Sequence, residues 1–337
     1  MPANDDRTVA VFGAGGYAGS LAARLLHNHP NFDLRWVTAR GDVGRRLDDV
    51  YPYHRVPLVL EEVDIDRHGD VNAAIVAYPH GASAPFVAQL RERGVKVVDL
   101  SADFRLRDAR TYEEWYKPHP EPELIAAAVY GLPELYRDEI AGAELVANPG
   151  CYPTATILAL APMARAGLIA DAVIDAKSGA SGAGRGATEE THFVTVDENV
   201  NAYGVPRHRH TPEIEQELAA LGNDVTITFT PHLVPLDQGE LVSSYVTLTD
   251  PTVSTGELED LYRDAYDAEQ FIELVREPPG VRAVRDTNIC RISLHRDERT
   301  GRAIVFGAID NLWKGTASQA VQNLNLMFGL PEAAGIA

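Results

Sequence analysis

A glycine-rich turn at residues 13–19, between a predicted strand and a predicted helix, constrains the fold more than any other feature. Residues 9–12 are an apolar run typical of a buried strand, and residues 20–26 follow an amphipathic helical pattern. Strand, glycine turn and helix in this order form a dinucleotide-binding fingerprint, because glycines let backbone N–H groups approach a pyrophosphate. The spacing is G-x-G-x-x-x-G, one residue longer than the commonest form. The turn predicts a cofactor site made of Gly13, Ala14, Gly15, Gly16, Tyr17, Ala18 and Gly19.

Alternating strands and helices continue this pattern over the first half of the chain. Strands are expected at 34–40, 73–77, 95–100 and 144–147, with a helix over 84–93. Such alternation predicts a parallel, doubly wound α/β sheet over residues 1–150. Loops after the carboxyl ends of these strands face the cofactor in this architecture, so we expect Ser101 to contact it.

The end of the second predicted strand favours NADP(H) as the cofactor. A site for NAD usually has Asp or Glu there to hold the ribose 2′-hydroxyl. This chain has Thr38 and Arg40 instead, and a hydroxyl and a guanidinium suit a 2′-phosphate. The competing interpretation of Arg40 is an ordinary solvated surface arginine.

Cys151 is the predicted nucleophile. The chain has only two cysteines, and this one follows Asn148-Pro149-Gly150 directly after the last strand of the first half. The turn and Pro153 predict a helix start, where unpaired N–H groups favour a thiolate over a thiol. The competing interpretation is a small buried hydrophobic residue. Because Cys151 follows the end of a strand, we expect it to lie beside the nicotinamide.

A second glycine-rich loop, at residues 177–186, follows a predicted strand at 172–175. Its two hydroxyl groups and one guanidinium suit an anion, so we expect Ser178, Ser181 and Arg185 to bind substrate. We expect Gly182 of the same loop to contact the cofactor. The competing interpretation is a flexible surface loop.

The segment His208-Arg209-His210 precedes a predicted helix with Thr211 as its N-cap. A helix start disfavours cationic charge, so a neutral imidazole suited to general acid–base chemistry is expected. We expect His208 to be the catalytic acid–base group and Arg209 and His210 to hold substrate. Zinc bound by Cys151 and these histidines is the rival interpretation, and no second ligand pair has suitable spacing, so no metal is expected.

The second half otherwise reads as a mixed or antiparallel sheet. Strand-like runs lie at 224–230, 241–248, 290–294 and 303–309, with one sheet face packed on helices and the other available for an oligomer interface. Asn311 follows the last of these strands and is expected to hold the nicotinamide amide. A helix is expected over 317–327.

Composition limits the partners. A chain of 337 residues is long enough for two domains, and its net charge of −19 argues against nucleic acid and anionic membrane surfaces. No apolar run approaches the ~20 residues of a membrane span. The N-terminus has no signal-peptide character, and two cysteines suit a reducing compartment, so we expect a cytoplasmic protein.

Taken together, these motifs resemble the N-acetyl-γ-glutamyl-phosphate reductase family. The matching segments are 13–19, 101–105, 148–154, 178–185, 208–214 and 310–316. Aspartate-semialdehyde dehydrogenases share the fold and a nucleophilic cysteine, but not the 208–214 segment. The resemblance implies an N-terminal Rossmann NADP-binding domain over 1–150, completed by the C-terminal helix 313–337. It also implies an α+β catalytic and oligomerisation domain over 151–312, similar to glyceraldehyde-phosphate dehydrogenase.

The resemblance implies NADPH-dependent reduction of a small-molecule acyl phosphate through a thioester on Cys151. Arg105 is expected to bind the phosphate or the α-carboxylate, and the side chain of Asn148, with the N–H of Cys151, to stabilise the oxyanion. A homodimer or homotetramer is expected. Two rival functions remain: reduction of a carrier-protein-bound aminoadipate 6-phosphate in lysine synthesis, and a non-catalytic NADP sensor, which would not need Cys151, His208 and the second glycine loop.

Overall fold

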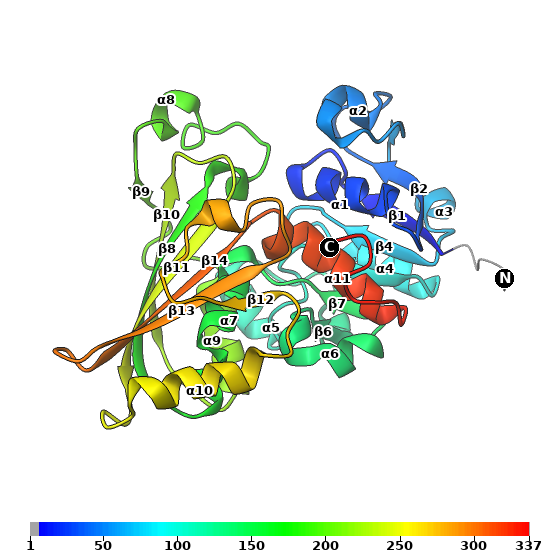
Figure 1. The fold of residues 1–337 in the computed structure, drawn as a ribbon. Coiled ribbons are helices and arrows are strands. Elements are labelled where there is room, and N and C mark those ends of the chain that lie inside the picture. The colour runs from blue at the N-terminus through cyan, green and yellow to red at the C-terminus, as the bar shows by residue number, and fades with distance from the viewer. Residues whose placement is uncertain (1–6, 337) are drawn as a thin grey trace. The chain divides into compact units, whose positions relative to one another are not determined.

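In the computed structural model, which describes residues 7–336, the chain divides into two units (Figure 1). Unit 1 is Met1–Pro149 with Thr316–Ala337, and unit 2 is Gly150–Gly315. The sequence placed the two boundaries at 150/151 and 312/313, whereas these units divide at 149/150 and 315/316. Each unit has its own sheet.

Unit 1 is built on a parallel sheet with the strand order β3-β2-β1-β4-β5-β7-β6. Every pairing in it is parallel, which confirms the predicted doubly wound sheet. Strands β1, β4 and β7 are fully buried, as expected of a sheet covered on both faces. The strands of this sheet are β1 (Thr8–Phe12), β2 (Asp33–Thr38), β3 (Leu60–Glu61), β4 (Ala73–Val76), β5 (Lys96–Asp99), β6 (Ala128–Tyr130) and β7 (Leu145–Ala147).

Helices connect the strands of unit 1 and cover its sheet. The last helix of the chain belongs to this unit, where it packs against α1, α6 and β5. Its contact with β5 completes the cover of the sheet with a segment distant in sequence. The helices are α1 (Tyr17–His27), α2 (Leu47–Val50), α3 (Ile65–His68), α4 (Ala84–Glu92), α5 (Ala109–Trp115), α6 (Pro133–Ala141) and α11 (Ser318–Met327).

Unit 2 contains a mixed sheet with the order β12-β13-β14-β11-β8-β10-β9. The β8–β10 and β12–β13 pairs are parallel and the other pairs are antiparallel, so the expected mixed sheet is confirmed. The strands are β8 (Ile169–Gly179), β9 (Asn201–Ala202), β10 (Ile227–Val234), β11 (Glu240–Leu248), β12 (Ile272–Leu274), β13 (Cys290–Asp297) and β14 (Arg302–Ile309).

Helix α7 (Cys151–Arg165) forms the centre of unit 2. It packs against β14, β11 and β8 of the sheet and against α9 (Thr211–Ala220) and α10 (Thr255–Tyr266). Gly307 allows the close approach, because a Cβ atom there would lie 2.8 Å from the carbonyl oxygen of Ala155. A short helix, α8 (Phe193–Val196), lies in the loop between β8 and β9. Within residues 7–336, no helix combines the length and apolarity required to span a bilayer.

Candidate active site

The glycine turn of unit 1 is shaped for a dinucleotide. Gly13 has φ +91°, and a Cβ atom there would lie 2.6 Å from the carbonyl oxygen of Ala77. A Cβ atom on Gly19 would overlap the carbonyl oxygen of Gly13, so the helix can approach the turn only without a side chain. Helix α1 begins at Tyr17 with no side-chain cap on its N-terminus. The first N–H groups of α1 therefore suit a pyrophosphate, because a helix leaves them without intrahelical partners.

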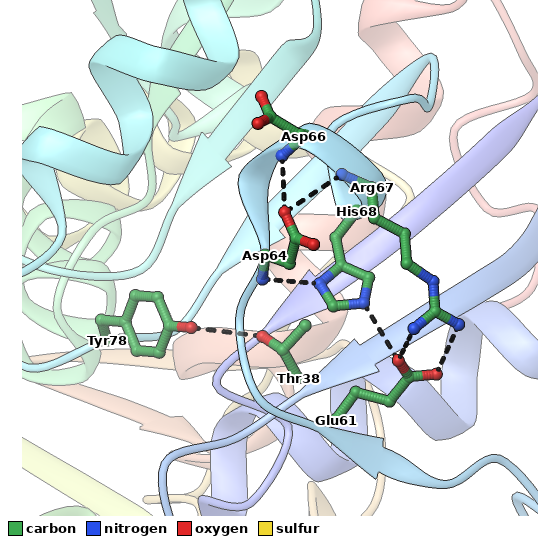
Figure 2. A network of polar contacts seen from close by, with 7 residues as sticks. All are labelled: Thr38, Glu61, Asp64, Asp66, Arg67, His68 and Tyr78. Atoms are coloured by element: carbon green, nitrogen blue, oxygen red, sulfur yellow. Dashed lines mark hydrogen bonds and ion pairs between the residues drawn. The ribbon is translucent and has the colours of Figure 1, made fainter.

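Thr38 and Arg40, the two residues expected to select NADP at the end of β2, differ in exposure. The hydroxyl of Thr38 is buried and lies 3.2 Å from that of Tyr78, as Figure 2 shows. Arg40 is exposed, with its guanidinium carbon 5.4 Å from the centre of the Tyr78 ring. Since the Thr38 hydroxyl faces the protein interior, Arg40 is the better placed of the two for a phosphate.

Glu61 is an acidic residue level with the end of β2, and its partners are protein side chains. It pairs with Thr38 across the β2–β3 ladder. Its carboxylate binds the guanidinium of Arg67 and lies 3.3 Å from Nε2 of His68 (Figure 2). These contacts compete with any use of Glu61 to hold ribose hydroxyls.

The loops after β4 and β5 are joined by two aspartates. Asp103 accepts hydrogen bonds from the backbone N–H groups of Ser83 and Ala84, at 3.2 and 3.0 Å, and so caps the start of α4. Asp99 is fully buried, and burial together with the charge of Asp103 raises its pKa to about 6. The hydroxyl of Ser101 donates to Asp99 at 2.5 Å. Ser101 thus helps to order this loop, and its contact with the cofactor stays a prediction.

Arg105 and Asn148 hold the segment that leads to Cys151. Arg105 donates from Nε to the carbonyl oxygen of Asn148 at 2.7 Å and from Nη2 to that of Leu100 at 2.8 Å. The Asn148 amide donates to the carbonyl oxygen of Thr316 at 3.2 Å and accepts from Asn323 at 3.1 Å. Both side chains are buried. These bonds give them a positioning role, and their predicted contacts with substrate remain predictions.

Cys151 is the first residue of α7, so the predicted helix start is confirmed. Its N-cap, Gly150, provides no side-chain cap, and the backbone N–H of Gly150 donates to Oε1 of Glu213 at 2.9 Å. A Cβ atom on Gly315 would lie 2.8 Å from that of Cys151, so the turn after β14 packs directly on Cys151. The partial positive charge of the helix N-terminus favours the Cys151 thiolate.

Helix α9 begins one residue away from the position expected. Thr211 was predicted as its N-cap, but Thr211 is the first helical residue and His210 is the N-cap. The cause is the carbonyl of His210, which accepts the N–H of Ile214 at 3.0 Å and so closes the first turn. The prediction for Thr211 was therefore wrong by one position, and the helix start brings His210 toward Gly150.

The two histidine rings contact each other, with centroids 4.9 Å apart, and both make an edge contact with Tyr152. The His208 ring makes edge contacts with Tyr152, Tyr203 and Phe229, with centroids 5.3–5.8 Å apart. Burial, and to a lesser degree the charge of Arg209, lower the pKa of His208 to about 4, so its ring is neutral near pH 7. The His210 ring lies against Gly150, where a Cβ atom would overlap its Nε2. His210 is thus the histidine beside the residue that precedes Cys151.

The second glycine loop and Asn311 meet in unit 2. Asn311 donates to the hydroxyl of Ser181 at 3.0 Å and accepts the backbone N–H of Gly239 at 2.7 Å. A Cβ atom on Gly182 would lie 3.0 Å from the Ser178 hydroxyl. Asn311 therefore fastens the loop to the start of β11, and its predicted contact with the nicotinamide stays untested.

The remaining predicted substrate residues, Arg185 and Arg209, are exposed. An exposed guanidinium in either position is accessible to an anion, which leaves their predicted role open. Within the part of the chain that the structure describes, no three or more His, Cys, Asp or Glu side chains are grouped to hold a metal ion.

Two buried carboxyl groups near Cys151 have no role predicted from the sequence. Glu213 holds Gly150, as described above. Glu240 begins β11, is fully buried, and has its pKa raised to about 8 by burial, although the Cys151 thiol and the Ser178 hydroxyl oppose the shift. The sequence pattern could have predicted the burial of Glu240, because this residue shares one face of the alternating strand β11 with the apolar residues Val242 and Val246.

Family comparisons define the class of protein. Residues 8–143 match the semialdehyde dehydrogenase NAD binding domain, and residues 151–311 match the semialdehyde dehydrogenase dimerisation domain. Solved structures agree on the fold. Aspartate semialdehyde dehydrogenase II from Vibrio cholerae superposes with a TM-score of 0.73 at 19% identity, covering 96% of this chain and 99% of that one. A probable aspartate-semialdehyde dehydrogenase from Pseudomonas aeruginosa gives 0.73 at 20% identity, with the same coverage.

Curated relatives narrow the class to one family. N-acetyl-gamma-glutamyl-phosphate reductase from Moorella thermoacetica is 50% identical over 333 residues, covering 96% of this chain and 95% of the relative. The enzyme of the same name from Desulforudis audaxviator is 49% identical over 341 residues, covering 97% of each. The chain belongs to the N-acetyl-gamma-glutamyl-phosphate reductase family, with a nicotinamide cofactor domain and a dimerisation domain that indicates an oligomer.

Proposed function

We propose that this chain reduces N-acetyl-L-glutamyl 5-phosphate to N-acetyl-L-glutamate 5-semialdehyde and phosphate. Support comes first from relatives of that name at about half identity over nearly the whole chain. The observation that carries the chemistry is Cys151 at the first position of α7, with its preceding residue held by Glu213 and packed against His210. A thiol poised at a helix N-terminus suits attack on an acyl phosphate.

The chemistry divides into two steps on Cys151. Its sulfur attacks the acyl carbon, a carbon–sulfur bond forms, and phosphate leaves with the electrons of the carbon–oxygen bond. When bound, the nicotinamide cofactor supplies the hydride that reduces the thioester carbon. The resulting thiohemiacetal loses the proton of its hydroxyl and expels the Cys151 thiolate as the aldehyde forms. The N–H groups at the start of α7 suit the developing negative charge on oxygen.

A histidine of the 208–210 segment moves the proton of the thiohemiacetal oxygen. The sequence favoured His208, but His208 is packed in an aromatic cluster with Tyr152, Tyr203 and Phe229. The contact of His210 with Gly150 supports His210 as the acid–base group, because a proton carrier must reach the atoms bound to Cys151. We therefore propose His210 as the acid–base group and His208 as the residue that orients it, since Nδ1 of His208 accepts the backbone N–H of His210 at 3.2 Å.

NADPH is the proposed form of the cofactor. Support comes from the exposed Arg40 after β2, which offers a 2′-phosphate a bidentate partner. The engagement of Glu61 by Arg67 and His68 adds to this support, because it occupies a carboxylate that otherwise suits the hydroxyl of NADH. For the oligomer we propose a homodimer, which the name of the matched domain favours over a homotetramer.

The experiment that tests this function compares substrates. Purified enzyme, NADPH and either N-acetylglutamyl phosphate or carrier-bound aminoadipate phosphate are incubated, and the aldehyde is detected by mass spectrometry. We expect N-acetylglutamyl phosphate to be reduced much faster than carrier-bound aminoadipate phosphate. Preference for the carrier-bound substrate assigns the same chemistry to lysine synthesis, and reduction of neither contradicts the proposal.

A further inference from the structure

Glu240 occupies an unusual position for a carboxyl group. It is the first residue of β11, paired with Ser178 of β8 on one side and Ile309 of β14 on the other. Its side chain shares the face of β11 that carries Val242 and Val246, and both valines are fully buried. Helix α7 packs on β8, β11 and β14, so this face belongs to the core of unit 2 beneath the helix that begins with Cys151.

The carboxyl group of Glu240 is shielded from solvent but poorly satisfied. Its side chain is fully buried, and among residues 7–336 neither of its oxygens has a hydrogen-bond partner of ordinary geometry. A buried carboxyl group with unsatisfied oxygens is expensive in either protonation state, so a purely structural role offers no reason to keep one there. A reacting partner close by offers such a reason.

Cys151 lies close to Glu240, because a Cβ atom on Gly315 would be 2.8 Å from Cβ of Cys151 and 3.2 Å from Cδ1 of Ile309, the residue paired with Glu240. The Cys151 thiol is the neighbour that most favours the charged form of Glu240, followed by the hydroxyl of Ser178. Of the other titratable groups around it, Asp310 opposes ionisation of Glu240. Burial, with a smaller contribution from Glu240, raises the pKa of Tyr152 and Tyr203, so both phenols stay neutral. Two adjacent negative charges on Cys151 and Glu240 are therefore strongly disfavoured in this core.

We propose that Glu240 is the proton acceptor of the Cys151 thiol, so that the two side chains share one proton and one negative charge. The shared state alternates between a thiol beside a carboxylate and a thiolate beside a carboxylic acid. As the sulfur–carbon bond forms, the S–H bond breaks and its proton moves to a carboxyl oxygen of Glu240. The proton returns when the thiolate is expelled, so the pair is unchanged over one turnover. The catalytic use of this proton transfer rests on the proposed function. The sharing of a proton between Cys151 and Glu240 does not depend on that function.

Burial of Glu240 explains why a carboxyl group fits this task. An exposed glutamate is far too acidic to take a proton from a thiol, whose ordinary pKa is about 8.5. Burial raises the pKa of Glu240 to about 8, so this carboxyl group is a far better proton acceptor than an exposed one. Transfer of the thiol proton to Glu240 leaves His210 free to serve the substrate oxygen.

The test is the pH dependence of Cys151 alkylation by iodoacetamide, which reports the thiolate fraction without substrate. Groups that share a proton lose it in two macroscopic steps, so the wild-type rate is expected to rise with pH in two steps. In Glu240→Gln the second step, at higher pH, should be lost and one simple titration remain. Glu217→Gln is the matched control, because Glu217 is also fully buried in unit 2 but bonds to Gln216. It should keep the two-step profile.

A conservative variant and a direct spectrum keep the test decisive if Glu240→Gln folds poorly. Glu240→Asp retains a carboxyl group and should keep two steps at shifted pH. Infrared titration of the wild-type enzyme should show a protonated carboxyl band that disappears as the second step is completed. A one-step wild-type profile, or a two-step profile unchanged in Glu240→Gln, overturns the inference. An inactive reductase that still shows the Glu240-dependent step contradicts the proposed function alone.

Discussion

The carboxylate of Glu213 accepts a hydrogen bond from the backbone N–H of Gly150, at 2.9 Å. Glu213 lies in the first turn of α9, three residues after the His210 N-cap, and Gly150 is the N-cap of α7. One buried hydrogen bond thus ties the helix that follows His210 to the helix that begins with Cys151. In the proposed mechanism, the relative position of the Cys151 nucleophile and the His210 proton carrier depends on this bond.

Glu213→Ala should lower kcat by about 10–100-fold, because removal of a hydrogen bond to a charged group costs about 1.5–3 kcal/mol. Steady-state kinetics with the aldehyde measures this effect. Glu215→Ala is the control, since Glu215 lies on the same helix but accepts the N–H of Ile227 at 3.0 Å. Equal losses of kcat in both variants contradict a specific role for the Glu213–Gly150 bond.

Gly150→Ala should impair catalysis while the cofactor still binds. The new Cβ atom overlaps Nε2 of His210, so the imidazole must move away from the start of α7. A 1 Å displacement near the chemistry can cost about 100-fold in rate. Gly256→Ala on α10 is the matched control, because a Cβ atom there meets nothing within 4 Å. We would measure kcat for both variants and their affinity for NADPH by fluorescence titration. A wild-type kcat in Gly150→Ala argues against the proposed position of His210.

His210→Asn and His208→Asn should differ. Loss of a general acid–base group costs about 10²–10⁴-fold in kcat, and we expect this for His210→Asn. His208→Asn should lose much less, because its neutral ring only orients its neighbours in our account. A comparison of the pH–rate profiles makes the distinction, since only the variant that lacks the acid–base group should lose the corresponding limb. The reverse order of rates returns the role to His208, the choice made from sequence.

Arg40→Ser should raise KM for NADPH about 10–100-fold and leave KM for NADH nearly unchanged, because only the phosphorylated cofactor loses a charge-assisted contact. Thr38→Val is the control, as the buried Thr38 hydroxyl bonds to Tyr78. It should affect thermal stability more than cofactor selectivity. A selectivity ratio that follows Thr38 and ignores Arg40 contradicts the assignment.

The stability of the enzyme should fall as pH rises from about 4.5 to about 8, in part through Glu240. In this window the folded carboxyl group still holds a proton that the unfolded one has released, so the free energy of unfolding decreases with pH. One such group contributes a slope of up to ~1.4 kcal/mol per pH unit. Thermal unfolding midpoints of wild type and Glu240→Gln measure it. As pH increases, the unfolding midpoint of wild type should fall relative to that of Glu240→Gln. A constant difference between the two midpoints contradicts the shifted pKa.

Local patterns in the sequence were sufficient for much of the fold. The glycine turn at 13–19 and the helix start at Cys151 depend on residues adjacent in the chain, and both were predicted. The parallel sheet followed from the alternation of strands and helices. The start of α9 was misplaced by one residue because Thr211 and His210 compete for the N-cap, and the first hydrogen bond of the helix decides between them.

Side-chain partners in the site were less predictable, because they depend on contacts between distant segments. Asn148 bonds to Asn323, which is 175 residues away, and this contact gives an apparent oxyanion donor a positioning role. Asn311 bonds to Ser181 across 130 residues in the same way. Glu240 was missed because its interest lies in its burial beside Cys151, and burial arises only when β8, β11 and α7 pack together.

The central claim is that Cys151 carries the acyl group during reduction. The most direct measurement is the reverse reaction, phosphate-dependent reduction of NADP⁺ by N-acetylglutamate 5-semialdehyde, with wild type, iodoacetamide-treated enzyme and Cys151→Ala. We predict formation of NADPH that requires phosphate, is lost on alkylation, and is absent in Cys151→Ala although this variant still binds NADPH. Unchanged turnover by Cys151→Ala contradicts the account.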